Sequence, residues 1–68
     1  MTQHAFTITI HCEDKNSQFT QERSTAAPND ILARDLVVKK FLAEYRGYAK
    51  SDVPTVLFCE VTYLAKLS

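Results

Sequence analysis

The longest pattern of apolar positions in the chain runs from Pro54 to Leu67 and predicts a strand. Alternate positions form one unbroken apolar face: Leu57, Cys59, Val61, Tyr63, Ala65 and Leu67. The opposite face is apolar at Val56, Phe58 and Leu64 and is interrupted by Glu60, Thr62 and Lys66. We therefore expect this strand to have apolar side chains to bury on both sides.

The segment from His4 to Cys12 alternates between apolar and more polar positions. One face carries Phe6, Ile8, Ile10 and Cys12, and the other carries Ala5, Thr7, Thr9 and His11. A strand with one face on a core and one in water is typical of antiparallel sheets. We expect both His4 and His11 to be exposed strand residues.

A polar turn over residues 13–17 joins this strand to a second one, from about Gln18 to Thr25. Asn16 is the turn residue most able to take a positive φ. If Asp14 pairs with Ser17, Cys12 faces Phe19, and the only large apolar residue of the second strand lies on the core side. The pattern predicts a hairpin whose second strand lies at a sheet edge.

A helix follows, with its start at Pro28, Asn29 and Asp30, where an amide or carboxylate side chain can cap free backbone N–H groups. Gly47 is the expected stop in a left-handed cap, although a continuation to Lys50 remains open. In that cap, Tyr48 would fold back toward Leu42 and Ala43. The stripe expected to face the sheet consists of Ile31, Val38, Phe41, Leu42, Tyr45 and Ala49.

The element order strand, strand, helix, strand predicts a single α+β domain over residues 1–68, with a mainly antiparallel three-stranded sheet. If the last strand lies beside the first, the sheet order is second, first, last and the helix covers one face. The alternative places the last strand parallel to the second by a right-handed crossover. We favour the first arrangement because the second strand is too weakly apolar to be central.

Leu32 and Leu36 lie one helical turn apart and point away from the expected stripe. Either the connector 24–28 covers them, or they form an exposed apolar patch for another chain.

Lys39, Arg46 and Lys50 share one helix flank, at spacings of seven and four residues, beside Tyr48. A solvated helix flank is the common explanation for such charges. Contact with phosphate groups of a nucleic acid is the alternative.

The chain of 68 residues carries eight Lys and Arg against eight Asp and Glu, so bulk charge attracts it to neither nucleic acid nor an anionic membrane. A domain of this size buries only about 60% of the surface that its unfolded chain exposes, so a partner subunit would add stability. The N-terminal residues lack the basic and apolar regions of a secretory signal. Cys12 and Cys59 are therefore expected to be buried free thiols in a reducing cytoplasm.

The sequence favours no catalytic or metal-binding constellation. His11 and Cys12 are adjacent in a strand and point to opposite faces, and two Cys with two His on mixed faces do not supply the four ligands of zinc. A single glycine excludes a glycine-rich phosphate loop. We expect no cofactor and no enzymatic activity, and a core this small argues against a ligand cavity of several hundred Å³.

The long last strand would lie at a sheet edge with little protection, since Pro54 guards only its beginning. The expected function is protein binding or regulation through this edge, as a homodimer or with a different protein. Glu60 either keeps the edge soluble or pairs with Lys66 of a second subunit. A phage or mobile-element accessory protein also fits this size and charge. The predicted interface residues are Val56, Phe58, Glu60, Leu64, Leu32 and Leu36, and the alternative function is nucleic-acid binding through the basic flank.

Overall fold

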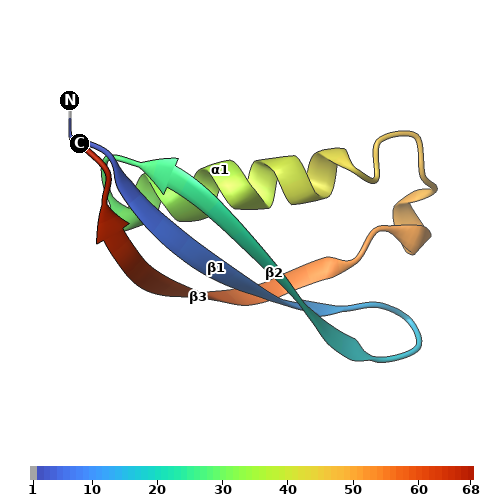
Figure 1. Ribbon diagram of the computed structural model, residues 1–68. Coiled ribbons are helices and arrows are strands. Elements are labelled where there is room, and N and C mark those ends of the chain that lie inside the picture. The colour runs from blue at the N-terminus through green and yellow to red at the C-terminus, as the bar shows by residue number, and fades with distance from the viewer. Residues whose placement is uncertain (1) are drawn as a thin grey trace.

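The computed structural model describes residues 2–68. Its elements are β1 (His4–Glu13), β2 (Gln18–Ala27), α1 (Asp30–Ala43), the 3₁₀ turn η1 (Lys50–Asp52) and β3 (Thr55–Lys66). The three strands form one antiparallel sheet in the order β2-β1-β3, and α1 lies on one face of it (Figure 1). The predicted α+β fold and strand order are confirmed, and the parallel alternative is wrong.

The hairpin between β1 and β2 has the predicted register, with Cys12 opposite Phe19. The Asp14 N–H donates to the Ser17 carbonyl at 3.0 Å. The Asp14 carboxylate accepts from the N–H groups of Asn16 at 2.8 Å and Ser17 at 2.9 Å. These backbone hydrogen bonds lower the pKa of Asp14. Asn16, the turn residue most able to take a positive φ, does not take one.

Helix α1 begins as predicted, with the Asn29 side chain accepting from the Leu32 N–H at 2.9 Å. It ends at Ala43, before Gly47, through a tighter turn in which the Tyr45 N–H donates to the Leu42 carbonyl at 3.1 Å. Gly47 then reverses the chain at φ +90°. Tyr48 folds back at this end, and its ring lies against that of Tyr45 with centroids 5.2 Å apart.

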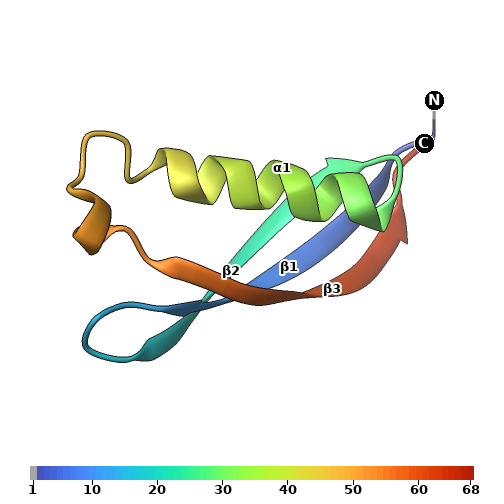
Figure 2. The same ribbon diagram turned by 180° about the vertical axis from the view of Figure 1, so that it is seen from behind.

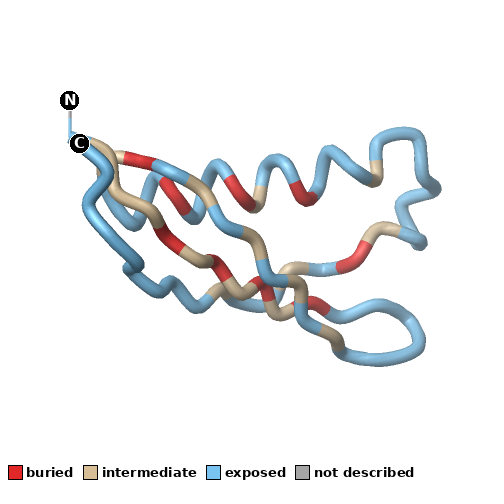
Figure 3. The backbone as a smooth tube through the Cα atoms, viewed as in Figure 1, coloured by how far each residue is buried: buried red, intermediate tan, exposed pale blue. Residues whose placement is uncertain are grey.

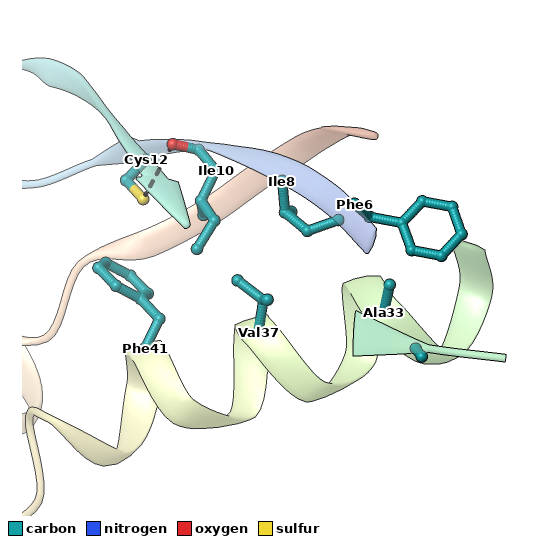
Figure 4. Packing of buried hydrophobic residues seen from close by; sticks show 8 residues of the cluster. Phe6, Ile8, Ile10, Cys12, Ala33, Val37 and Phe41 are labelled. Carbon is teal, nitrogen blue, oxygen red and sulfur yellow. Dashed lines mark hydrogen bonds between the residues drawn. The ribbon is translucent and has the colours of Figure 1, made fainter. Parts of the chain in front are cut away.

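The core lies between β1 and the inner side of α1. The helix contributes Ala33, Val37 and Phe41, one every four residues, which point at the buried side chains of β1 (Figure 4). The complete buried cluster is Phe6, Ile8, Ile10, Cys12, Ala27, Ala33, Val37 and Phe41.

The predicted helix stripe was correct for Phe41 and for the half-buried Tyr45 but wrong for Ile31 and Leu42, which are 59% and 39% exposed. Apolar residues occur on several sides of this helix, so periodicity alone does not select one face. Contact with the twisted sheet selects the helix face that has a small side chain at Ala33 and a large one at Phe41.

Two irregularities interrupt the pairing of β3 with β1. Leu57 and Leu64 of β3 have no paired residue in β1, so each forms a β-bulge. Each bulge reverses the alternation of faces, so Val56 lies opposite Cys12 on the helix side. The prediction that Val56 shares a face with Phe58 is therefore wrong, and so is the single unbroken face from Leu57 to Leu67.

Helix α1 packs closer to β2 and β1 than to β3. Seen from behind, β3 is the strand nearest the viewer and runs below α1 (Figure 2). The burial colouring shows the same asymmetry, because β3 is exposed along nearly its whole length (Figure 3). The strand with the strongest apolar pattern is thus the one that the helix covers least.

Candidate functional site: the open strand β3 and its groove

Strand β3 exposes large apolar side chains on both faces of the sheet. Only Val56 and Cys59 are partly buried among its twelve residues. The helix lies closer to β2 and β1 than to β3, so even the helix-side residues Val61 and Tyr63 remain exposed. The exposed large apolar residues at this end of the chain are Leu57, Phe58, Val61, Tyr63, Leu64 and Leu67.

The two edges of the sheet differ in chemistry. On β2 the exposed positions are polar or small: Gln18, Thr20, Glu22, Ser24 and Ala26. On β3 the regular section between the two bulges, residues 58–63, carries Glu60 as its only charge. Each of these two sets contains a single charge, so the difference between the edges lies in the large apolar side chains that β3 exposes and β2 does not.

The exposed area is also larger than a chain of this size usually has. It is 4776 Å² for a mass of 7.7 kDa. A folded monomer of that mass exposes about 4,300 Å² on average. The surplus is consistent with a surface that another chain covers.

A groove of about 630 Å³ lies between α1 and β3. Phe58 lines it together with Val56 and Cys59, although Phe58 pairs with His11 on the outer face, so the groove opens at the free edge of the strand. The expectation that no space of several hundred Å³ exists is wrong, because the helix leaves β3 uncovered instead of sealing the core. The helix contributes the other lining residues: Leu32, Arg34, Asp35, Leu36, Val38 and Lys39.

Leu32 and Leu36 form the apolar part of the helical wall. They are 45% and 42% exposed. The explanation that the connector 24–28 covers them is wrong, since β2 continues to Ala27 and both side chains line the groove on the side of β3. The structure therefore brings Leu32 and Leu36 to the same surface as Val56 and Phe58.

On the outer face of the sheet, His11 connects two predicted interface residues. Its ring stacks on Phe58, with centroids 4.1 Å apart and planes 10° apart. Its Nε2 lies 2.6 Å from the Glu60 Oε1. Glu60 points outward, as one of the two predictions had it, and it already has a partner within its own chain.

His4 lies on the helix side of the sheet, not exposed as predicted. Strand alternation places it with Phe6, and its ring lies 6.3 Å from Phe6 and 5.6 Å from Tyr63. The His4 Nδ1 is buried without a hydrogen-bond partner. The strand begins at His4 as predicted, but its alternation outweighs the polar character of His4, so the residue becomes part of an aromatic cluster at the start of α1.

Both cysteines are free and lie on the helix side of the sheet. Cys12 is fully buried, and burial together with the nearby Cys59 thiol raises its pKa. Burial also raises the pKa of Cys59, which Arg34 partly opposes. Cys59 pairs with Ile10, next to Cys12 on the same face of the sheet, but Cys59 alone lines the groove and is only partly buried.

The predicted basic flank does not lie on one helix. Lys39 lies within α1 and lines the groove, whereas Arg46 follows the last helical residue and Lys50 begins η1. Gly47 reverses the chain between them, so the spacing of seven and four residues no longer defines one face. Contact of these residues and Tyr48 with nucleic acid stays a prediction.

Within residues 2–68, no three side chains among His, Cys, Asp and Glu gather in an arrangement that could hold a metal ion. None of the helices in this part of the chain has the length and apolar character needed to cross a membrane.

Sequence reasoning missed two parts of this surface. Tyr63 was assigned to a buried face, and Cys59 was not connected with Leu32 and Leu36. Alternation identifies the face of a strand but not how far a helix extends across it. No feature of the sequence indicated that α1 would lie toward β2.

Comparison with known proteins gives no relative: the chain matches no protein-family model, and neither a curated protein nor a solved structure shows significant similarity to it.

Proposed function

We propose that this chain is a non-enzymatic protein-binding module whose contact surface is the free edge of β3, and that a second copy of the chain is its partner. The observation that carries the proposal is the contrast between a polar β2 edge and a β3 edge with large exposed apolar residues on both faces. A symmetric pairing of two β3 strands would form a continuous six-stranded sheet. Two-fold dimers are the commonest assemblies of soluble chains.

The size of the apolar surface favours a lasting contact. Burial of apolar area contributes roughly 25 cal/mol per Å² before the costs of association are subtracted. Phe58, Tyr63 and Leu64 are each more than half exposed, at 56%, 55% and 53%. Three such side chains on each copy would meet across one edge, and the backbone ladder would align them.

The mass in solution tests this proposal directly. We expect light scattering to show a dimer that dissociates on dilution. The Phe58→Glu variant should be a folded monomer, because it places a charge within the contact while Phe58 contributes little to the buried core. Circular dichroism checks that the variant keeps the helix and the sheet.

Ile31→Glu is the matched control. Ile31 is 59% exposed, close to the exposure of Phe58, but it lies on α1 and does not line the groove. This variant should keep the mass of the original chain. A chain that is monomeric at every concentration, or a Phe58→Glu variant that unfolds, would contradict self-association through β3.

A further inference from the structure

We infer that two copies pair their β3 strands antiparallel with Val61 on the two-fold axis, and that Tyr63 of each copy covers the mouth of the α1/β3 groove of the other. The inference rests on the proposed function, because it specifies the register of that contact. It also gives the groove an occupant from a second copy of the same chain.

Symmetry restricts the possible registers. Two antiparallel strands of one sheet are related by an axis perpendicular to that sheet, so the helices of both copies lie on the same face. Directly opposite residues in such a pair also point to the same face. Within the regular section 58–63, an odd-numbered residue must therefore face an odd-numbered one, and the axis must pass through a residue rather than between two.

Three neighbouring registers are less favourable than the one at Val61. An axis at Glu60 places two carboxylates directly opposite each other, which is destabilising. An axis at Thr62 places Glu60 opposite Leu64 of the second copy. An axis at Tyr63 would place Phe58 opposite residue 68, beyond the end of β3 at Lys66, so that it stays uncovered.

The register at Val61 matches side chains of like character. Cys59 lies opposite Tyr63 of the second copy, and Phe58 lies beside the second bulge of that copy, at Leu64. Glu60 lies opposite Thr62, and its carboxylate keeps the hydrogen bond with His11. The regular pairing covers residues 59–63 of each copy, and the bulged ends of β3 flank it on both sides. Phe58, Tyr63 and Leu64, the most exposed apolar residues of β3, are all covered in this register.

The same register explains the groove. Cys59 lines it, and directly opposite side chains in an antiparallel pair have Cβ atoms about 4.5–5.5 Å apart. Tyr63 of the second copy therefore lies beside Cys59 on the helix side, at the edge where the groove opens. Leu32 and Leu36 form the opposite wall, so an aromatic ring at this place has apolar side chains on both sides.

Disulfide trapping tests the register. In a Cys59→Ser background, whose remaining native thiol Cys12 is fully buried, Val61→Cys places two thiols opposite each other across the axis. Under mild oxidation near the dissociation concentration, we expect this variant to form a covalent dimer at least ten times faster than Thr62→Cys. Non-reducing electrophoresis measures the rate, and light scattering measures the mass of the reduced variants.

Tyr63→Ser tests the contact at the groove. We expect it to raise the dissociation constant of the dimer at least tenfold, while Tyr48→Ser, at a similarly exposed tyrosine, leaves the constant unchanged. Because Tyr63 also contacts Phe6, urea unfolding of dilute Tyr63→Ser checks that the monomer is still folded.

The outcomes separate the two proposals. A dimer in which Thr62→Cys forms the disulfide faster, or in which Tyr63→Ser and Tyr48→Ser act alike, would overturn the register and keep the proposed function. A monomer at all concentrations would overturn both and leave β3 for a strand of a different protein.

Discussion

The two edge strands of this sheet flank the same central strand, yet their exposed surfaces differ in chemistry. Strand β2 is polar, and α1 covers it: Arg23 bonds Glu44 at 3.2 Å and lies over the Phe41 ring at 5.9 Å. Strand β3 is apolar and α1 leaves it largely bare. The helix therefore covers the edge that has less apolar area to bury, which is the reverse of what an isolated chain would favour.

In the proposed dimer, the helix position also serves the contact between the two copies, because it leaves β3 free. A helix shifted toward β3 would cover Val61 and Tyr63. It would then expose the side of β2 that faces the helix, whose side chains are largely polar. With the helix as it is, the apolar surface that remains is concentrated on one edge and in one groove. Concentrated apolar surface next to an unpaired backbone ladder is typical of a site for strand addition.

The largest expected effect separates the core from the open edge. Ile10→Ala should lower the free energy of unfolding by about 2–5 kcal/mol, because Ile10 is fully buried beneath α1. Leu64→Ala should change it by less than about 1 kcal/mol in dilute monomer, because Leu64 is half exposed. Urea unfolding measures both. A large loss in the dilute Leu64 variant would show that β3 is already covered within one copy.

A charge on each edge tests the difference between them. Thr62→Glu should raise the dissociation constant of the dimer by about tenfold or more, because it places a carboxylate opposite Glu60 of the second copy at two symmetric positions. Thr62→Lys should keep or strengthen the dimer. Thr20→Glu, at an exposed threonine of β2, should leave the constant unchanged. Equal effects of the three substitutions, measured by light scattering, would remove the distinction between the edges.

The two thiols should report the same distinction with a smaller signal. Cys59 should react with an alkylating reagent before the buried Cys12, and more slowly as the protein concentration rises and the groove is covered. Both reactions should be slow at neutral pH, because burial raises the pKa of both thiols and lowers their thiolate fraction. Mass spectrometry of the labelled chain gives both rates, and a concentration-independent rate at Cys59 would argue against a covered groove.

The raised thiol pKa values also predict an alkaline limit of stability. A group whose pKa is higher in the folded chain stabilises the fold fully below its unfolded value, ordinarily 9.0, and this contribution is lost as the pH rises above that value.

The smallest effect concerns the turn that joins β1 to the polar edge strand β2. The carboxylate of Asp14 accepts two backbone N–H groups, which lowers its pKa. Its contribution to stability is thus present above the ordinary value of 3.8 and is lost as the pH falls below it. Asp14→Ala should destabilise the hairpin slightly at neutral pH, whereas Asp14→Asn should keep the turn and flatten the acid dependence. An unchanged acid limb in thermal unfolding of Asp14→Asn would contradict this role.

Much of the architecture could be predicted from local patterns. Alternation over Phe6, Ile8 and Ile10 defined the central strand, and a single large apolar residue, Phe19, defined the hairpin register. The predicted interface residues Phe58, Leu64, Leu32 and Leu36 are all exposed apolar side chains in the structure. Prediction failed where two elements had to be placed against each other, as for Ile31 and Val56.

The sequence by itself determined the elements, their order and the unprotected character of β3, because period, capping and turn chemistry act within a few residues. Only the tertiary structure decided which helix face is buried, where the bulges at Leu57 and Leu64 reverse the alternation of β3, and that α1 leaves a groove beside this strand. These features depend on how a twisted sheet and a helix fit in three dimensions, and a helix with apolar residues on several sides can dock in more than one way.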